Sequence, residues 1–274
     1  MTRRRKVILI LVLVPVLLYA AVCAAVFFLQ TSLIFPVSQV GPAGPLPPGA
    51  ERVTLRAASG ERLTGLHVPP DAAAAGAPPL ILGFGGNAWN ADSMAAYLHE
   101  LYPQTEVVTF HYRGYPPSEG SPSADALRAD ALAIFDWAVR PFPDRRRIAA
   151  GFSIGSGVAA WLAAHRPLDG AILVTPFDSL AGAGADHYPW LPVRLLFRHE
   201  MAAAEDLRRS RVPVAILAGQ RDDLILPVRT EALRRAVANL AYDHVVAGAG
   251  HNDIYQHEDF QAAMREALAT LLRR

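Results

Sequence analysis

Short apolar segments alternate with segments of helical periodicity from residue 51 onward, and this alternation constrains the fold more than any other feature of the chain. Segments with strand character lie at 52–55, 63–68, 80–82, 107–111, 148–151, 171–174, 214–218 and 244–246. Segments with helical character lie at 93–101, 124–139, 155–165, 230–238 and 256–274. Strands separated by helices imply a mainly parallel sheet with helices on both faces. The sequence therefore predicts an α/β fold, in which the first two strands form a hairpin around Ser59-Gly60.

Two stretches of this body lack a clear strand or helix. Residues 71–79, DAAAAGAPP, have the low complexity of a loop. Residues 176–212 contain no clear strand, and we expect them to lie over the sheet as a small cap.

The N-terminus has a different composition. Residues 7–29 contain no charged side chain and follow a cluster of four cations at residues 3–6. Because about 20 apolar residues span a bilayer, we expect one transmembrane helix over 7–29, in which Pro15 is tolerated. The cations would keep residues 1–6 in the cytoplasm and place the rest of the chain outside it. The alternative is a secreted protein, since small residues between 20 and 25 also suit a signal-peptide cleavage site.

The stretch that follows the apolar run is uncharged over residues 30–50. Its core, PVSQVGPAGPLPPG at 36–49, is rich in proline and glycine, as is typical of an extended linker. We therefore expect a tether over 30–50 and a single folded domain over 51–274.

Charge and missing residue types exclude several functions. The chain carries a net charge of +1, yet after residue 29 there are 22 basic and 25 acidic side chains. A mildly acidic body without a basic patch argues against nucleic acid as a partner. No lysine follows Lys6, which excludes a Schiff-base lysine, a Walker-type lysine and a Ser-Lys dyad from the body. Cys23 is the single cysteine, so neither a disulfide nor a thiolate metal site is expected, and we expect no cofactor.

The motif G-x-S-x-G occurs at residues 151–155, GFSIG, between an expected strand and an expected helix. A strand–turn–helix of this kind presents a nucleophilic serine on a sharp turn, for which Gly151 and Gly155 leave room. Small residues kept only for packing are the alternative, but they do not explain a serine at the apex. Ser153 is therefore the candidate nucleophile.

A serine hydroxyl needs a base, and the base needs an orienting acid. On α/β-hydrolase folds the three groups follow the order Ser, Asp, His, each after a strand. Asp222 and Asp223 follow the seventh expected strand, and His251 follows the eighth. The other eight histidines are weaker candidates by position, although His111 also follows a strand. His251 is thus the candidate base, and either aspartate is a candidate acid.

An oxyanion hole needs two backbone N–H groups that point at the developing negative charge. One is expected from Ile154, the residue after the nucleophile. The other is expected from the loop GFGGNAWN at 83–90, with Asn87 as the candidate and a plain polar turn residue as the alternative. This loop also fits the loose dinucleotide pattern G-x-G-x-x-A, but the next strand ends in His111 and Tyr112 where that site needs an acid.

Taken together, the motifs resemble the membrane-anchored α/β-hydrolases of the Bem type, serine hydrolases related to acylaminoacyl peptidases and fatty-acyl thioesterases. The segments that carry the resemblance are QTSLIFP (30–36), GFGGNAWN (83–90), HYRGYPPSEGSPS (111–123), GFSIGSGVA (151–159), TPFDSL (175–180), YPWLPV (188–193) and AGAGHND (247–253). The resemblance implies an α/β-hydrolase fold with a small cap, preceded by one N-terminal transmembrane helix.

The resemblance also helps to choose the acid. The family pattern G-x-x-D-x-L-I-P-P-V lies on GQRDDLILPV at 219–228 and puts the acid at Asp222. A stricter D-x-x-x-P pattern would select Asp223, and Asp178 is a more distant third candidate. The sequence departs from the family where Gly85 replaces a histidine and Trp89 replaces a glycine, so we expect Trp89 to line and narrow the pocket.

These observations predict a membrane-anchored serine hydrolase that cleaves an ester, thioester or amide through an acyl-enzyme, in the manner of a carboxylesterase, thioesterase, lipase or peptidase. Its tether favours small-molecule or lipid-like acyl substrates. The alternative is a non-catalytic membrane-tethered binding or scaffold protein on the same fold. The residues leave the oligomeric state open.

Overall fold

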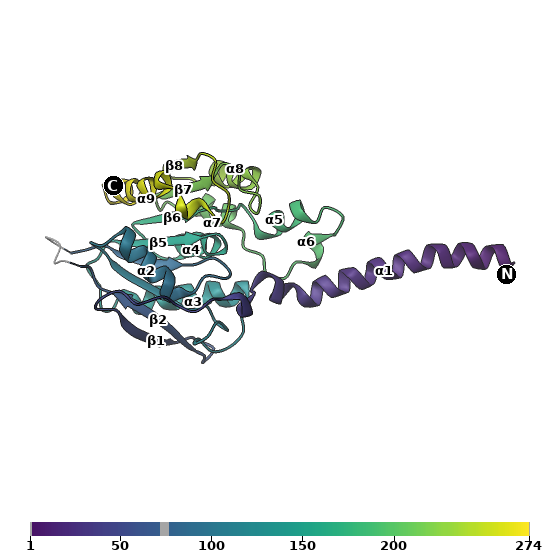
Figure 1. The fold of residues 1–274 in the computed structure, drawn as a ribbon, viewed down its shortest axis with the longest axis horizontal. Coiled ribbons are helices and arrows are strands. Elements are labelled where there is room, and N and C mark those ends of the chain that lie inside the picture. The colour runs from purple at the N-terminus through teal and green to yellow at the C-terminus, as the bar shows by residue number, and fades with distance from the viewer. Residues whose placement is uncertain (1, 72–76, 274) are drawn as a thin grey trace.

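A computed structural model describes residues 2–71 and 77–273, so most of the expected loop at 71–79 lies outside the described residues. One eight-stranded sheet runs through the body in the order β1-β2-β4-β3-β5-β6-β7-β8 (Figure 1). Its strands are β1 (Glu51–Arg56), β2 (Arg62–Val68), β3 (Leu80–Phe84), β4 (Glu106–Phe110), β5 (Arg147–Phe152), β6 (Gly170–Val174), β7 (Val214–Gly219) and β8 (Leu240–Val246). β2 pairs antiparallel with β1 and β4, and all the other pairs are parallel. The expected hairpin and mainly parallel sheet are confirmed.

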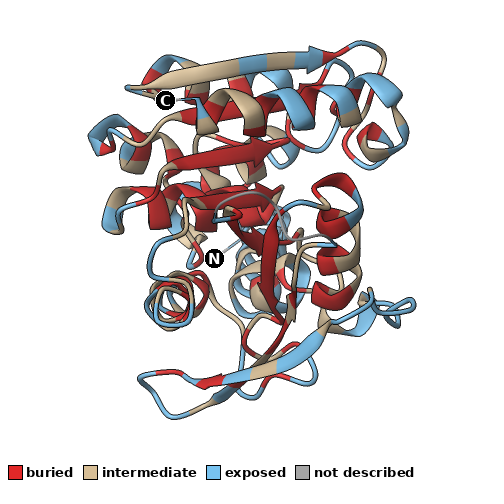
Figure 2. Cartoon of the chain, turned by 90° about the vertical axis from the view of Figure 1, so that its left-hand side faces the viewer, coloured by how far each residue is buried: buried red, intermediate tan, exposed pale blue. Residues whose placement is uncertain are grey.

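Helices cover both faces of the sheet, as expected. One face packs against α3 (Ala124–Ala138), α4 (Ile154–His165), α7 (Ala203–Arg209) and α8 (Pro227–Ala236). The other face packs against α2 (Ala91–Leu101) and α9 (Glu258–Leu272). Figure 2 shows the buried residues concentrated in the central strands, whereas the edge strands β1 and β8 carry exposed ones. This burial holds the carboxyl ends of the parallel strands rigidly along one edge of the sheet.

Some element ends differ from the expectation for local reasons. α8 begins at Pro227 rather than at residue 230, because a proline at the first helical position loses no hydrogen bond. β8 begins at Leu240 rather than at 244, since an edge strand needs no continuous apolar run. A short 3₁₀ turn, η2 (Ile254–Gln256), precedes α9.

The N-terminal helix α1 (Arg3–Ile34) projects away from the body (Figure 1). It is long and apolar enough to cross a membrane, with a mean hydropathy of 3.0 over its best window. It also runs beyond residue 29, so the expected linker does not begin at residue 30. Phe35, only 2% exposed, joins the hydrophobic core just past the helix, and the 3₁₀ turn η1 (Val37–Gln39) follows it. The segment after the apolar run is thus packed on the body over its first residues, because its apolar side chains have a core to enter.

The segment at 176–212 contains three helices and no strand. α5 (Leu180–His187) and the short α6 (Val193–Leu196) lie beside the end of α1 that is nearest the body (Figure 1). α7 instead packs on the sheet side, with Ala203 and Leu207 in the core. Only α5, α6 and the loops around them overhang the carboxyl edge of the sheet, and we call this part the cap (residues 180–200).

Candidate active site

Ser153 lies on the turn between β5 and α4. Its backbone has φ +51° and ψ −118°, in the left-handed region that is costly for a residue with a side chain. Such a conformation costs about 1–3 kcal/mol and persists only where the surroundings enforce it. Here the Ser153 N–H donates to the carbonyl of Val174 on β6 at 2.9 Å. The turn is therefore held in a strained shape that lifts the side chain off the sheet edge.

Two glycines make this turn sterically feasible. A Cβ on Gly151 would lie 2.3 Å from the carbonyl oxygen of Gly155. A Cβ on Gly155 would lie 2.1 Å from the carbonyl oxygen of Phe84 on β3. Neither position accepts a larger residue, since both contacts are with backbone atoms that cannot move aside.

The structure brings the hydroxyl of Ser153 to a histidine and an aspartate from the next strand ends. His251 Nε2 lies 2.9 Å from Ser153 Oγ, and His251 Nδ1 lies 2.9 and 3.1 Å from the two carboxylate oxygens of Asp222. The backbone N–H groups of Leu224 and Ile225 donate to Asp222 Oδ1 at 3.0 and 2.7 Å. The side chains of His251 and Asp222 are 5% and 3% exposed, so little water competes for these bonds.

The other candidate acids lie elsewhere. Asp223 is exposed and turned to the surface, and its carboxylate has no hydrogen bond to His251 within the described chain. Asp178 faces Arg229, whose Nη1 lies 3.4 Å from its Oδ2. Of the three aspartates, the structure joins only Asp222 to the histidine.

The candidate oxyanion donors border the serine. Ile154 is the first residue of α4, so its N–H has no partner inside the helix and belongs to the positive end of the helix dipole. Asn87 lines both cavities that reach Ser153. Its side-chain amide donates to the carbonyl of Ile34 at the end of α1, at 3.2 Å, so this side chain is held against α1 and the backbone N–H is the candidate donor to an oxyanion.

Two tyrosines that sequence reasoning missed brace the oxyanion loop. The Tyr112 hydroxyl donates to the carbonyl of Gly85, and the Tyr115 hydroxyl donates to the carbonyl of Asn87, both at 2.8 Å. Burial raises the pKa of both phenols, so they remain donors. Both lie in the HYRGY stretch at 111–115, which marked a family resemblance without a role for its tyrosines. Both tyrosines therefore hold the backbone of the loop that contains Gly85 and Asn87.

Two cavities are lined in part by Ser153. One, of about 170 Å³, is predominantly apolar, and its walls include Ile34, Phe177, Ala183, Gly184 and Phe197. The other, of about 280 Å³, contains more polar groups, and its walls include Trp89, Leu224, Asn252 and Tyr255. The Trp89 ring lies in this second wall, with its centroid 5.1 Å from that of Phe152 and 5.2 Å from that of Tyr255.

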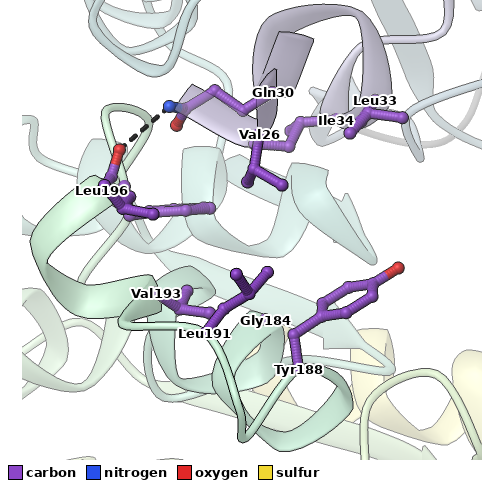
Figure 3. Close-up of a pocket in the computed structure, with 10 residues that line it drawn as sticks. Val26, Gln30, Leu33, Ile34, Gly184, Tyr188, Leu191, Val193 and Leu196 are labelled. Carbon is purple, nitrogen blue, oxygen red and sulfur yellow. Dashed lines mark hydrogen bonds between the residues drawn. The ribbon is translucent and has the colours of Figure 1, made fainter. Parts of the chain in front are cut away.

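A third cavity, of about 370 Å³, lies between α1 and the cap. Figure 3 shows Val26, Leu33 and Ile34 of α1 facing Leu191 and Val193 of the cap across this space. It is also predominantly apolar.

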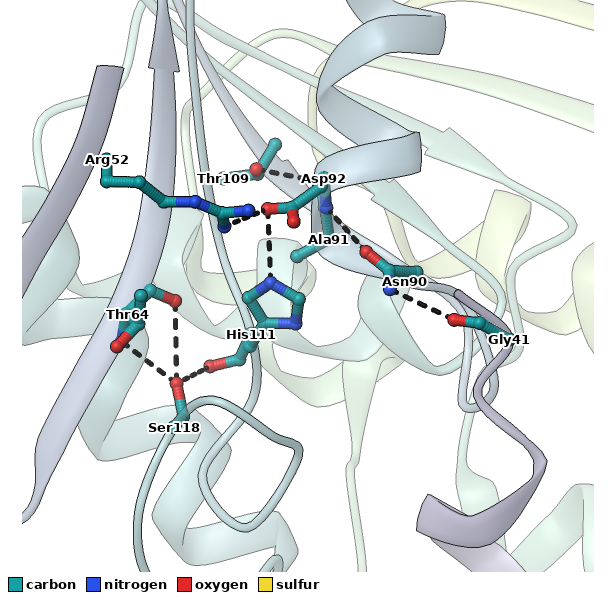
Figure 4. Close-up of polar contacts among 9 residues, drawn as sticks. All are labelled: Gly41, Arg52, Thr64, Asn90, Ala91, Asp92, Thr109, His111 and Ser118. Carbon is teal, nitrogen blue, oxygen red and sulfur yellow. Dashed lines mark hydrogen bonds and ion pairs between the residues drawn. The ribbon is translucent and has the colours of Figure 1, made fainter. Parts of the chain in front are cut away.

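A second buried aspartate–histidine pair lies between the first turn of α2 and the end of β4 (Figure 4). His111 Nε2 lies 3.1 Å from Asp92 Oδ1, and Arg52 Nη1 lies 2.7 Å from the same oxygen. The Ser118 hydroxyl donates to the backbone carbonyl of His111 at 2.8 Å, not to its ring. Burial alone would raise the pKa of Asp92, but the hydrogen bonds from His111 and Arg52 outweigh it and lower that pKa. The pair ties β1, α2 and the end of β4 together.

Within residues 2–71 and 77–273, no three histidine, cysteine, aspartate or glutamate side chains gather in a group able to hold a metal ion.

Comparison with known proteins identifies the architecture. The model of the alpha/beta hydrolase fold family matches residues 79–205. An uncharacterized protein of Mycobacterium tuberculosis is 37% identical over 222 residues, which cover 77% of this chain and 78% of that protein. The lysophosphatidylserine lipase ABHD12 of Danio rerio is 32% identical over 139 residues, 44% of this chain and 36% of the lipase. The rat lipase of the same name is 27% identical, over 59% of this chain and 48% of the lipase. The match therefore spans less than half of either lipase.

Solved structures agree on the fold. The Pyrococcus furiosus esterase Pf2001 superimposes with a TM-score of 0.67 at 17% identity, over 85% of this chain and 97% of the esterase. A membrane phospholipase A described as a bacterial virulence factor superimposes with a TM-score of 0.63 at 14% identity, over the full length of both chains. The family model, the mycobacterial relative and these structures lead to one conclusion: the chain belongs to the alpha/beta hydrolase fold family.

Proposed function

We propose that this protein is a serine hydrolase of the Bem type that cleaves acyl esters or thioesters through a covalent acyl-enzyme. The observation that carries the proposal is the unbroken hydrogen-bonded chain from Ser153 Oγ through the ring of His251 to Asp222. It begins at a strained turn beside two cavities and ends in a buried carboxylate, which is the geometry that nucleophilic catalysis by serine requires.

In the first half of the reaction, Ser153 Oγ attacks the acyl carbonyl carbon while its proton moves to His251 Nε2. The tetrahedral intermediate then collapses, the bond to the leaving group breaks, and that group takes the proton from His251 and departs as an alcohol or thiol. In the second half, His251 removes a proton from water, which attacks the acyl-enzyme. The carboxylic acid leaves and Ser153 recovers its hydrogen.

Asp222 has a supporting role in both halves. Its carboxylate accepts from His251 Nδ1, which orients the ring so that Nε2 faces the serine. Its negative charge also stabilises the imidazolium that forms when His251 takes the proton. We assign the oxyanion hole to the backbone N–H groups of Ile154 and Asn87, since both residues line the apolar cavity beside the serine.

We propose that α1 is retained as a membrane anchor, with residues 1–6 in the cytoplasm and the hydrolase body outside it. The hydrogen bond from the Tyr19 hydroxyl to the carbonyl of Trp190 in the cap supports retention, because Tyr19 lies before Ala24 and cleavage there would remove this contact. Sequencing the N-terminus of the protein in the membrane fraction tests this. An intact start agrees with an anchor, whereas a start near Ala24 would mean a cleaved signal peptide and a secreted enzyme.

The names of the similar proteins favour acyl esters over amides, since they include an esterase, a lysophosphatidylserine lipase and a phospholipase A. The apolar walls beside Ser153 favour the same class, because an acyl chain gains free energy there by leaving water.

Labelling with a fluorophosphonate probe tests the proposal against a non-catalytic scaffold. We expect the purified full chain to be labelled and Ser153→Ala not to be, with a turnover number lowered by about 10⁶ for p-nitrophenyl butyrate. Circular dichroism of Ser153→Ala controls for folding. Absence of labelling in a folded wild-type protein would favour the scaffold.

A further inference from the structure

We propose that α1 and the cap together bind the acyl chain of a membrane lipid, and that this chain reaches Ser153 sideways from the bilayer. The inference rests on the proposed hydrolase function and adds the substrate class and its route. In this view α1 is one wall of the substrate site as well as an anchor.

The walls of the cavity between α1 and the cap define its chemistry. Val26, Leu33 and Ile34 line it from α1, and Leu191 and Val193 line it from the cap (Figure 3). Phe197 of the cap lines it as well. Apolar walls of this extent favour a hydrocarbon ligand and offer no charged group to a polar one.

This cavity adjoins the one at the serine. Ile34, Gly184 and Phe197 line both cavities, so these three residues form the boundary between them. In the proposed path the acyl chain passes between these three residues, so that the two cavities act as one apolar groove from α1 to Ser153 and Ile154. A hydrocarbon chain in the groove would present its carboxyl end to the nucleophile.

The length of α1 places the open end of the groove at the membrane surface. About 20 helical residues cross the hydrocarbon layer of about 30 Å, so a span that starts at residue 7 ends near Val26. Gln30 and Ile34 then lie at the level of the lipid headgroups. The mouth of the groove therefore opens where a lipid ester bond is found.

The cap extends along α1 toward the lipid. Tyr188, Trp190 and Leu195 are 53%, 57% and 86% exposed, unusually high values for large apolar side chains clustered in one short segment. The Tyr19 hydroxyl donates to the carbonyl of Trp190 at 2.9 Å, which holds this part of the cap against the apolar part of α1. Aromatic residues prefer the membrane interface, so this exposed face fits contact with lipid rather than with water.

Gln30 fixes the width of the groove. Its side-chain amide donates to the carbonyl of Leu196 at 2.9 Å, and its carbonyl oxygen accepts from the N–H of Arg198 at 2.8 Å. Thr31 adds a hydrogen bond between its Oγ1 and His199 Nε2 at 2.8 Å. Gln30 is thus a positioning residue that holds the cap at one distance from α1.

The first experiment measures chain length against rate. Each methylene buried in the groove is worth about fourfold in kcat/KM. For the full chain in lipid nanodiscs, we expect kcat/KM to rise along a series of p-nitrophenyl esters from butyrate to laurate. A flat or falling series would overturn the proposal.

Paired tryptophan variants separate the groove from simple partitioning of long esters into the membrane. Val26→Trp fills the mouth of the groove, whereas Leu29→Trp adds the same bulk on an exposed side of the same helix. We expect Val26→Trp to lower the laurate-to-butyrate ratio of kcat/KM by about fourfold for each methylene displaced. We expect Leu29→Trp to keep the wild-type ratio. Equal ratios in the two variants would overturn the proposal.

A second pair tests the junction of the two cavities. A Cβ on Gly184 would make ordinary contact with Val193 Cγ1 at 3.4 Å, so Gly184→Ala fits, whereas Gly184→Phe fills the junction. We expect the laurate-to-butyrate ratio to fall in Gly184→Phe and much less in Gly184→Ala.

Gln30→Leu tests the positioning role. It removes both hydrogen bonds to the cap at similar volume, and we expect a higher KM for laurate with fluorophosphonate labelling of Ser153 retained. An unchanged KM would remove Gln30 from the proposal.

Fluorophosphonate labelling distinguishes failure of the proposed groove from failure of the proposed hydrolase function. A wild-type protein that is labelled but shows no preference for long chains keeps the proposed hydrolase function and loses the groove. A folded protein that is not labelled loses both.

Discussion

The Asp222–His251 pair and the Asp92–His111 pair are built from the same two residue types at similar distances, although His251 faces its aspartate with Nδ1 and His111 with Nε2. The nitrogen–oxygen distances are 2.9 and 3.1 Å, and all four side chains are at most 5% exposed. Each histidine follows a strand of the same sheet. The two pairs differ in what else touches them. His251 offers its second ring nitrogen to Ser153, whereas Asp92 shares its carboxylate with Arg52 (Figure 4).

This difference shows that a buried aspartate–histidine pair is not by itself a catalytic device. The Arg52 guanidinium neutralises Asp92, so little negative charge remains there to stabilise a protonated His111. Asp222 accepts instead from two neutral backbone N–H groups and keeps a full charge for the imidazolium of His251. Only the Asp222–His251 pair combines an uncompensated carboxylate with a nucleophile and a cavity.

The largest expected effect compares the same substitution in the two pairs. Asp222→Asn keeps the size of the side chain but favours the wrong tautomer of His251, so we expect kcat for p-nitrophenyl butyrate to fall by about 10⁴. Asp92→Asn, assayed in the folded protein, should keep the wild-type kcat. Steady-state kinetics of both variants checks this. Similar losses in the two would mean that the pairs do not differ in function.

For the free energy of unfolding we expect a clear effect of removing Asp92, the residue whose substitution should leave kcat unchanged. Asp92→Ala leaves the buried His111 without its acceptor, whereas the half-exposed Arg52 can turn to water, and an unsatisfied buried donor costs about 1–3 kcal/mol. We expect that loss in the free energy of unfolding, measured by urea denaturation of the full chain in detergent. Asp223→Ala is the matched control, because an exposed aspartate should change stability by less than about 0.5 kcal/mol. A loss for Asp92→Ala as small as that of the control would contradict a structural role for the pair.

Most of the fold could be predicted from the sequence, because the periodic spacing of apolar residues and the turn-forming residues are local signals. The parallel sheet, the hairpin and the strand–turn–helix at Ser153 all follow from such signals. The serine and histidine candidates also followed, since the order of strands places their loops at one edge of the sheet. The choice between Asp222 and Asp223 did not follow from the residues alone. It depends on which carboxylate accepts hydrogen bonds from the backbone N–H groups of Leu224 and Ile225. Two adjacent aspartates in a turn have the same local sequence, so the sequence does not indicate which of them does so.

The contacts around α1 lay beyond sequence reasoning. Gln30 and Leu196 are 166 residues apart, and neither belongs to a motif that predicts a contact between them. The proline- and glycine-rich stretch at 36–49 indicated a free tether, yet Phe35 beside it is buried in the core. The sequence also did not predict that Asp92 pairs with an arginine and Asp222 does not. Arg52 lies 40 residues before Asp92, and no local motif marks it as a partner.

A smaller effect concerns the backbone strain at Ser153, which neither residue of the Asp92–His111 pair shares. Ser153→Ala and Ser153→Gly both remove the hydroxyl, but only glycine relaxes at φ +51°. We expect Ser153→Gly to be more stable than Ser153→Ala by about 1 kcal/mol, because relief of strain exceeds the larger entropy that glycine loses on folding. Urea denaturation of the two inactive variants checks this. Equal stability would mean that the turn stores no strain.

The smallest expected effect is the pH dependence of the Asp92–His111 pair. The pKa of Asp92 is lowered in the folded protein, so its carboxylate binds protons less readily there than in the unfolded chain, where aspartate has a pKa of about 3.9. Its contribution to stability is therefore present above that value and is lost as pH falls through the lowered folded pKa. We expect the difference in free energy of unfolding between wild type and Asp92→Asn to shrink as pH falls from about 5 to about 3. Urea denaturation across that range measures the difference directly, and the subtraction cancels the acid groups that both proteins share. A difference that stays constant or grows at low pH would mean that Arg52 and His111 do not stabilise the charged form of Asp92, and the contrast with Asp222 would lose its electrostatic basis.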